Sequence, residues 1–305
     1  MGLKEKLVSF LEGNTLTRNN LVKPIRDYRL DKHYRYLAKL GEISGEELAN
    51  WEHRIEKVKI SSDNARINKL PNAGELKGGK LIMHNGLKID PLSYYGAPML
   101  KMFMENKAVH EPQEEYVFQE VLKTIKPGAV MLELGCYWGF YSMWFANVIQ
   151  DNKNFLIDNS DGIARAKANF ALNNLKASFM EGYIGKDNPN SDIPVTNVDR
   201  ICKEKNIEFI DVLHSDIQGF ELEMLQTMPQ MVKNRAIGYI FISTHSKELH
   251  YGCIDWLREN GYEILCHADL ENSFSEDGLI VAKDPAYAGI DSIKISQLQE
   301  ETAKV

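Results

Sequence analysis

The stretch AVMLELGCYWGFYSMWFANVI, residues 129–149, decides the fold of this 305-residue chain. A short apolar run predicts a buried strand, a turn with two glycines follows, and the aromatic-rich residues from Phe140 onward predict a helix. Glu133 lies near the strand end, and Gly135 and Gly139 follow four residues apart. Glycine serves where a backbone must turn sharply or approach a ligand closely. The stretch therefore predicts a strand–turn–helix unit able to carry a binding site.

The same alternation of strands and helices continues towards the C-terminus. Strands are predicted at residues 129–134, 155–159, 177–185, 209–216, 237–245, 262–269 and 278–283, and helices at 140–149, 161–175, 197–205, 220–228 and 247–260. Alternating units with apolar strands predict an α/β fold, a mostly parallel, doubly wound sheet with helices on both faces. The last two strands are expected to form a terminal hairpin. In such sheets ligands bind beyond the carboxyl ends of the strands.

The residues before this sheet show a different pattern, with helical spacing first and a hairpin after it. Apolar residues recur at helical spacing over residues 21–40, and Ser44 with Glu47 resembles a capping box. KLIMH, then Asn85-Gly86, then LKID predicts a hairpin with a type I′ turn. We expect three parts: an accessory helical region with a hairpin at 1–111, the sheet domain at 112–290, and a peripheral polar tail at 291–305.

Composition narrows the class of protein. The chain has 36 Lys and Arg against 43 Asp and Glu, a net charge of −7, which argues against a general nucleic-acid binder. None of the four cysteines forms a CxxC pair, which fits a reducing compartment. The longest uncharged run is too short to span a bilayer. We therefore expect a cytoplasmic protein without a membrane span.

The glycine turn differs from a dinucleotide-binding turn. It lacks the third glycine of GxGxxG, and its acidic Glu133 tends to repel a pyrophosphate. An acidic strand end suits a cationic ligand, and S-adenosylmethionine carries both a sulfonium and an ammonium group. Tyr137 lies in the turn, where it could contact such a ligand. A turn whose glycines serve packing alone remains the alternative.

A second acidic residue follows at the spacing expected for ribose binding. Asp158 ends the next strand, about twenty residues after the turn, where a carboxylate typically binds ribose hydroxyls. Asp161 is available to cap the following helix. Asp158 is therefore predicted to bind a ligand.

Polar residues also crowd two later strand ends. His214, Asp216 and Gln218 follow one strand, and His245 follows the next. If these strands are neighbours, Asp216 and His245 share one crevice. A carboxylate beside an imidazole can deprotonate a hydroxyl, or the pair can hold a divalent metal such as Mg²⁺ or Mn²⁺. A capping or core role for any single histidine is the alternative.

These segments resemble the FkbM-type S-adenosylmethionine-dependent methyltransferases. The matching stretches are VMLELGCYWGFYSMWFA, FLIDNSDGIARAKANFALNN, VTNVDRI, IDVLHSDIQGFELEML and STHSKELHYGCIDWLRENGYEI. The resemblance covers about residues 112–283 and implies a class I methyltransferase, Rossmann-like, with seven strands of which the last is antiparallel. His214 stands where many members have Lys, and Gln218 where many have Glu. The HxDIQGxE and THSxxxH forms indicate a subgroup.

The resemblance also implies roles for single residues. Glu133, Gly135 and Gly139 would form the methionine-binding turn, with Tyr137 beside it. Asp158 would bind the ribose, and Asp216 would lie near the transferred methyl group.

The family generally methylates hydroxyl oxygens, often of sugars, so we expect an O-methyltransferase for a nucleotide-linked sugar or a glycan in polysaccharide biosynthesis. We expect His245 to act as the base with Asp216, with His214 as the alternative base. Asp216 and His245 as metal ligands are a further alternative, and a homodimer through the N-terminal helices stays open. A catalytically silent structural subunit that binds the cofactor or a partner is the competing hypothesis. The glycine spacing disfavours a nicotinamide-dependent oxidoreductase.

Overall fold

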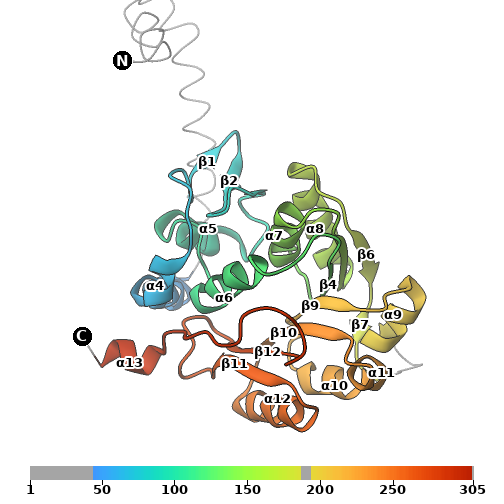
Figure 1. Cartoon of the computed structure of the whole chain (residues 1–305). Helices are drawn as coiled ribbons and strands as arrows, with labels where there is room; N and C mark the ends of the chain where they lie inside the picture. Colours follow the sequence, from blue (N-terminus) through green and yellow to red (C-terminus); the bar gives the residue numbers. More distant parts are fainter. Residues whose placement is uncertain (1–43, 187–193, 304–305) are drawn as a thin grey trace, which may run out of the picture.

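A seven-stranded mixed sheet forms the centre of the computed structural model, which describes residues 44–186 and 194–303 (Figure 1). Its strands are β4 (Val130–Leu134), β5 (Lys153–Asp158), β6 (Ser178–Glu181), β9 (Ile210–Ser215), β10 (Ile237–Thr244), β11 (Glu263–Ala268) and β12 (Gly278–Lys283). They lie in the order β11-β12-β10-β9-β4-β5-β6. β12 runs antiparallel to both neighbours, and the strands from β10 to β6 are parallel. The predicted α/β fold, with its antiparallel last strand, is confirmed.

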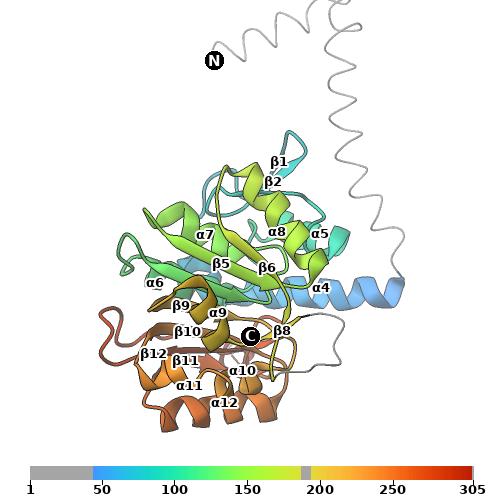
Figure 2. The same cartoon turned by 90° about the vertical axis from the view of Figure 1, so that its right-hand side faces the viewer.

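Helices cover both faces of this sheet (Figure 2). On one face lie α6 (Pro112–Leu122), α7 (Phe140–Val148) and α8 (Ser160–Leu172), and on the other α9 (Val198–Lys205), α10 (Glu221–Gln226), α11 (Pro229–Lys233) and α12 (Lys247–Glu259). Side chains alternate between the faces because successive residues of a strand point to opposite sides. Met131 packs with Phe118 of α6, whereas Leu132 packs with Met224 of α10. The sheet therefore separates two hydrophobic cores.

The residues before α6 pack on the α6–α7 face. They form α4 (Gly45–Ile60), the 3₁₀ helix η3 (Ser62–Arg66), the antiparallel strands β1 (Leu76–Lys77), β2 (Lys80–Ile82) and β3 (Lys88–Ile89), and α5 (Gly96–Glu105). The predicted cap is present, since Ser44 Oγ accepts a 3.2 Å hydrogen bond from the Glu47 backbone. The helical pattern predicted over 21–40 lies outside the described residues.

The predicted hairpin is confirmed, but its turn type is not. Gly86 N donates to Met83 O and Met83 N donates to Leu87 O, so the loop has three residues. Gly86 has a φ of +88° whereas Asn85 does not have a positive φ, which a type I′ turn would require. The longer loop points His84 inward, where it contacts the rings of Phe140 and Trp144.

The C-terminal segment is less peripheral than the sequence suggests. Tyr287 donates a 2.6 Å hydrogen bond to Asp211. Ser296 is buried, and its backbone N and Oγ both donate to Asp63 of η3. Ile295 and Ser296 are the buried residues of the described part of this segment, and the short helix α13 (Leu298–Thr302) has none. The segment thus ties η3 to the sheet domain.

The four cysteines are free and buried. Within residues 44–186 and 194–303, no helix combines the length and the apolar character needed to span a membrane.

Candidate active site

A cavity of about 550 Å³ opens at the carboxyl ends of β4, β5 and β9. Its walls come from those strand ends, from the short parallel pair β7 (Tyr183–Ile184) and β8 (Val195–Thr196), and from the accessory region before α6. The strand ends and the turns after them contribute Glu133, Gly135, Tyr137, Asp158, His214 and Asp216. The accessory region contributes Tyr94, Tyr95, His110 and Glu111. Six of the sequence-predicted residues therefore share one cavity with residues of the N-terminal part, whereas Gly139 and His245 lie outside the lining.

Gly135 lets two loops approach each other at the cavity floor. Its φ is +74°, and an added Cβ would lie 1.8 Å from the backbone oxygen of Asp216. No larger residue fits there without moving a backbone. Gly139 serves a different contact, because its Cβ would lie 3.1 Å from Ala166 Cβ, where α7 packs on α8. It does not line the cavity, so its predicted cofactor role stays untested.

Asp158 holds the turn after β4 in place. Its Oδ2 accepts a 2.6 Å hydrogen bond from Tyr137 N, and its Oδ1 accepts one from Asn159 N. Tyr137 has a φ of +45°, so this bond supports an unfavourable backbone conformation. The expectation that Asp161 caps α8 is wrong, since the Asn159 side chain accepts from the first turn instead. Each oxygen of Asp158 keeps a further lone pair for a ligand hydroxyl.

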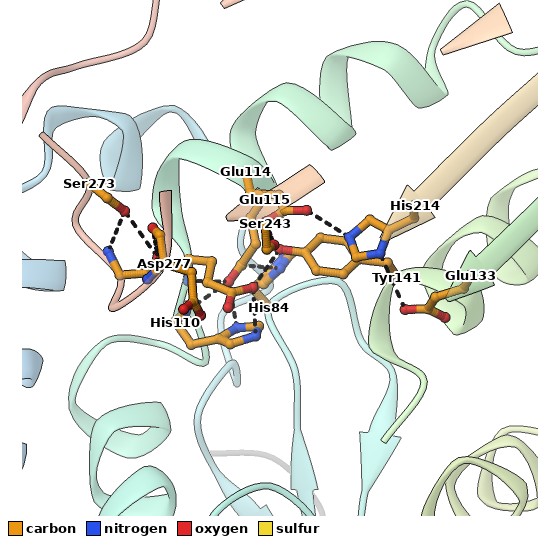
Figure 3. Close-up of polar contacts among 12 residues, drawn as sticks. His84, His110, Glu114, Glu115, Glu133, Tyr141, His214, Ser243, Ser273 and Asp277 are labelled. Carbon is orange, nitrogen blue, oxygen red and sulfur yellow. Dashed lines mark hydrogen bonds and ion pairs between the residues drawn. The ribbon is translucent and has the colours of Figure 1, made fainter. Parts of the chain in front are cut away.

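Glu133 and His214 lie side by side on the face towards α6 (Figure 3). His214 Nε2 lies 2.7 Å from Glu114 Oε1, and its Nδ1 lies 3.8 Å from Glu133 Oε1. Burial lowers the pKa of His214, but the charge and hydrogen bond of Glu114 outweigh it and raise the pKa to about 9. Burial raises the pKa of Glu133 to about 7, against the opposing charge of His214. His214 is thus charged at neutral pH.

The structure does bring Asp216 and His245 together, as predicted. Their Oδ1 and Nε2 atoms lie 3.3 Å apart, while Nδ1 of His245 lies 2.8 Å from Glu221 and Nε2 lies 3.4 Å from Asp277. Burial lowers the pKa of His245, but hydrogen bonds with Asp216 and Glu221 and the charge of Asp277 raise it to about 10. At this pKa His245 holds a proton at neutral pH, and the base role predicted for it requires that proton to leave first.

Gln218 and Asp216 line the cavity, whereas His245 lies behind them and does not line it. The Gln218 amide lies 3.0 Å from Asp216 Oδ1 and 2.8 Å from His245 Nε2. In the part of the chain that the structure describes, no group of three or more His, Cys, Asp or Glu side chains is arranged to hold a metal ion.

Sequence reasoning missed Glu114 and Glu115 at the start of α6. Glu114 contacts His214, and Glu115 contacts His84 and His110. From the sequence, His110 and Glu111 precede this helix and reach the pocket if the N-terminal part folds over it, and both do line the cavity. Figure 3 shows Glu114 and Glu115 beside these histidines. One signal was available: both carboxylates lie three or four positions before Phe118, so they share its buried helix face.

Comparison with known proteins gives the family. The model of the methyltransferase FkbM domain matches residues 86–264, which is more than half of the chain. The chain belongs to the FkbM methyltransferase family. It is therefore a methyltransferase with an α/β fold of the class I type. No curated protein matches it.

Similar solved structures are also methyltransferases or related proteins. A precorrin-6Y C5,15-methyltransferase from Geobacter metallireducens has 12% identity and a TM-score of 0.40, and the match covers 55% of this chain and 89% of that one. M. capricolum TrmK, solved with S-adenosylhomocysteine, has 17% identity and a TM-score of 0.38, with 58% and 71% covered. Methanococcus jannaschii fibrillarin has 17% identity and a TM-score of 0.38, with 52% and 67% covered. Such low identities leave the substrate of this methyltransferase open.

The cavity residues of this FkbM-family chain fit a cationic nucleoside cofactor. Gly135 allows the turn and the Asp216 loop to approach each other at the cavity floor, and Asp158 lines the cavity at the second strand end. Nδ1 of His214 is buried without a hydrogen bond, and Glu133 Oε1 lies 3.8 Å from it.

Proposed function

We propose that this protein is an S-adenosylmethionine-dependent O-methyltransferase that methylates a hydroxyl group of a sugar, either nucleotide-linked or part of a glycan. Glu133, Gly135, Tyr137, Asp158 and Asp216 are the proposed cofactor-binding residues. When bound, the cofactor supplies an activated methyl group. Membership of the FkbM family supports the methyl transfer, and the acceptor class rests on the resemblance to that family.

One observation carries this proposal: the strand ends of the sheet and the accessory region before α6 line a single cavity. Its volume of about 550 Å³ lies in the range of small-molecule sites. Asp158 and Asp216 lie on the side of the strand ends, whereas Tyr94 and Glu111 lie on the side of the accessory region. We infer that the cofactor binds to the strand ends and that the acceptor lies between it and the accessory region.

In this proposal the Asp216–His245 pair orients the acceptor. Asp216 lines the cavity, and the charged His245 behind it holds its carboxylate in place. Asp216 can then accept a hydrogen bond from an acceptor hydroxyl. A divalent metal held by the same two residues is the alternative, and it requires His245 to lose its proton.

The first test is calorimetric titration with S-adenosylmethionine and S-adenosylhomocysteine, with and without Mg²⁺. We expect micromolar binding, about −8 kcal/mol. Asp158→Asn should weaken it at least tenfold, whereas the matched change Asp161→Asn should not, since Asp161 is exposed and pairs with Arg165. Failure of the folded wild type to bind either compound refutes the proposal and favours the silent subunit.

The second test uses radiolabelled S-adenosylmethionine with panels of nucleotide-sugars, oligosaccharides and amines. Label on a sugar oxygen is the expected product. Label on nitrogen or carbon refutes O-specificity while leaving the methyltransferase assignment intact. Activity that requires Mg²⁺ and disappears in Asp216→Asn favours the metal alternative.

A further inference from the structure

Glu111 lines the cavity from the accessory side. It is the residue directly before α6, and its side chain is 13% exposed. Tyr141 OH donates a 2.8 Å hydrogen bond to its Oε2, and His110 Nε2 lies 3.3 Å from the same oxygen. Both neighbours contact one oxygen, so Oε1 remains available to a bound molecule.

A buried ion-pair cluster fixes Glu111 from behind. Glu115 Oε1 accepts backbone hydrogen bonds from His110 and Glu111, at 2.8 and 2.9 Å. The same carboxylate lies 2.6 Å from His110 Nδ1 and 2.8 Å from His84 Nε2. Glu115, His110 and His84 are each 1% exposed or less. Neither the backbone of Glu111 nor the neighbouring His110 ring can therefore move freely.

Four other titratable groups in or beside the cavity are already engaged by neighbours. His214 and His245 are held charged by carboxylates. Each oxygen of Asp158 accepts one backbone hydrogen bond, and its remaining lone pairs are assigned above to the cofactor ribose. Asp216 is shared between Gln218 and His245 and remains bound to them.

Glu111 also has a suitable proton affinity. Burial raises the pKa of its carboxyl to about 7, helped by the charges of Glu114 and Asp216 and opposed by His110. Its carboxyl is then partly ionised at neutral pH, which is the condition under which a general base works best. Glu133 has a similar pKa, but it is almost fully buried beside His214.

We propose that Glu111 is the general base of this methyltransferase and that His110 and Glu115 are its positioning residues. The inference rests on the function proposed above. As the acceptor oxygen forms its bond to the methyl carbon, its proton passes to Glu111 Oε1. The methyl–sulfur bond breaks, and its electron pair stays on sulfur. The products are the methyl ether, neutral S-adenosylhomocysteine and a protonated Glu111, which returns its proton to water.

A binding experiment tests this without an acceptor. A sulfonium near Glu111 stabilises the carboxylate, so at pH 7 the wild type should release a fraction of a proton on binding S-adenosylmethionine and less on binding S-adenosylhomocysteine. Calorimetry in buffers of different ionisation enthalpy counts these protons. Glu111→Gln should reduce the difference by the share that Glu111 contributes, and the remainder belongs to Glu133, whose pKa is also about 7. Glu223→Gln, at another cavity carboxyl that holds the Lys186 backbone, should keep it. An unchanged difference in Glu111→Gln overturns the proposal.

A kinetic experiment follows with whichever acceptor the label screen identifies. Glu111→Gln should lower kcat by about 10²–10³-fold with an S-adenosylmethionine Kd within twofold of wild type. The rise of kcat around pH 7 should also disappear. A kcat within threefold of wild type, or a retained pH profile, overturns the base assignment.

Two safeguards keep the outcomes separate. If Glu111→Gln does not fold, Tyr141→Phe replaces it, because loss of the donated hydrogen bond should move the acid limb of kcat to higher pH. An unmoved limb counts against the proposal. If the wild type binds the cofactor but no acceptor is found, proton counting still decides the role of Glu111. If the wild type binds no cofactor, the proposed function fails, and this inference with it.

Discussion

Replacing Glu115 by Gln should destabilise the protein more than any other single change of one side-chain atom on α6. The carboxylate is fully buried and contacts His84 and His110 at 2.8 and 2.6 Å. Glutamine can still accept the two backbone hydrogen bonds, but it removes the negative charge beside two buried imidazoles. Breaking a buried ion pair by removing one partner typically costs 3–5 kcal/mol, so we expect about 3 kcal/mol or more.

The dependence on pH gives this prediction a second signature. Burial raises the pKa of Glu115, but the charges of His110 and His84 outweigh it and bring the pKa well below its usual range. A carboxyl whose pKa is lowered on folding stabilises the protein above its unfolded pKa of about 4.3, and this stabilisation fades as the pH falls. The difference between wild type and Glu115→Gln should therefore be full at pH 7 and shrink below about pH 4.

Urea unfolding followed by circular dichroism at several pH values measures both effects. Glu120→Gln is the matched control, because Glu120 lies on the same helix and pairs with the exposed Lys123. Such surface pairs contribute about 0–1 kcal/mol. With unchanged m-values, a shift in midpoint reports stability directly. Equal midpoints for Glu115→Gln and Glu120→Gln would refute the reasoning that the buried cluster holds α6 in place.

Three further predictions follow from the same geometry. Gly135→Ala should abolish cofactor binding or folding, because its Cβ would lie 1.8 Å from Asp216 O; titration and thermal unfolding check this. Tyr141→Phe should raise the pKa of Glu111, since the lost hydrogen bond had lowered it, and NMR titration of the carboxyl carbon measures the shift. The stability contributed by His214 should be full below about pH 6.5 and fade as the pH rises through about 9, because folding raises its pKa; urea midpoints between pH 6 and 10 test this.

Each of these predictions has a control. Gly128→Ala also places Cβ at a positive φ, but nothing lies within 4 Å, so only backbone strain of about 1 kcal/mol should appear. Tyr116→Phe should leave the Glu111 titration unchanged. Glu114→Gln should flatten the alkaline fall in stability, because it removes the partner that raises the pKa of His214. A fall of unchanged size in Glu114→Gln would contradict the explanation.

The order of strands and helices could be predicted from the sequence because it depends on local periodicity. The capping residue Ser44 was identified correctly for the same reason, since it acts within one turn of its helix. The positions of Glu133, Asp158 and Asp216 in one cavity also followed from the sequence, because parallel strands end at one sheet edge.

Predictions from local sequence patterns were wrong for two features that depend on packing, the turn type of the hairpin and the cap of α8. Asn85-Gly86 favours a type I′ turn locally, yet burial of His84 beside Trp144 accompanies a three-residue loop. Asp161 and Asn159 are both capable caps, and only the backbone path after Asp158 selects Asn159.

The sequence by itself determined the α/β fold, the glycine turn and the acidic strand ends of this FkbM-family methyltransferase. Only the tertiary structure decided which charges meet. Glu114 lies 100 residues before His214, yet their side chains are 2.7 Å apart, because α6 crosses the face on which His214 projects. A pKa depends on burial and on neighbouring charges, and neither is encoded locally. The role that we assign to Glu111 therefore depends on distant neighbours that only the tertiary structure places around it.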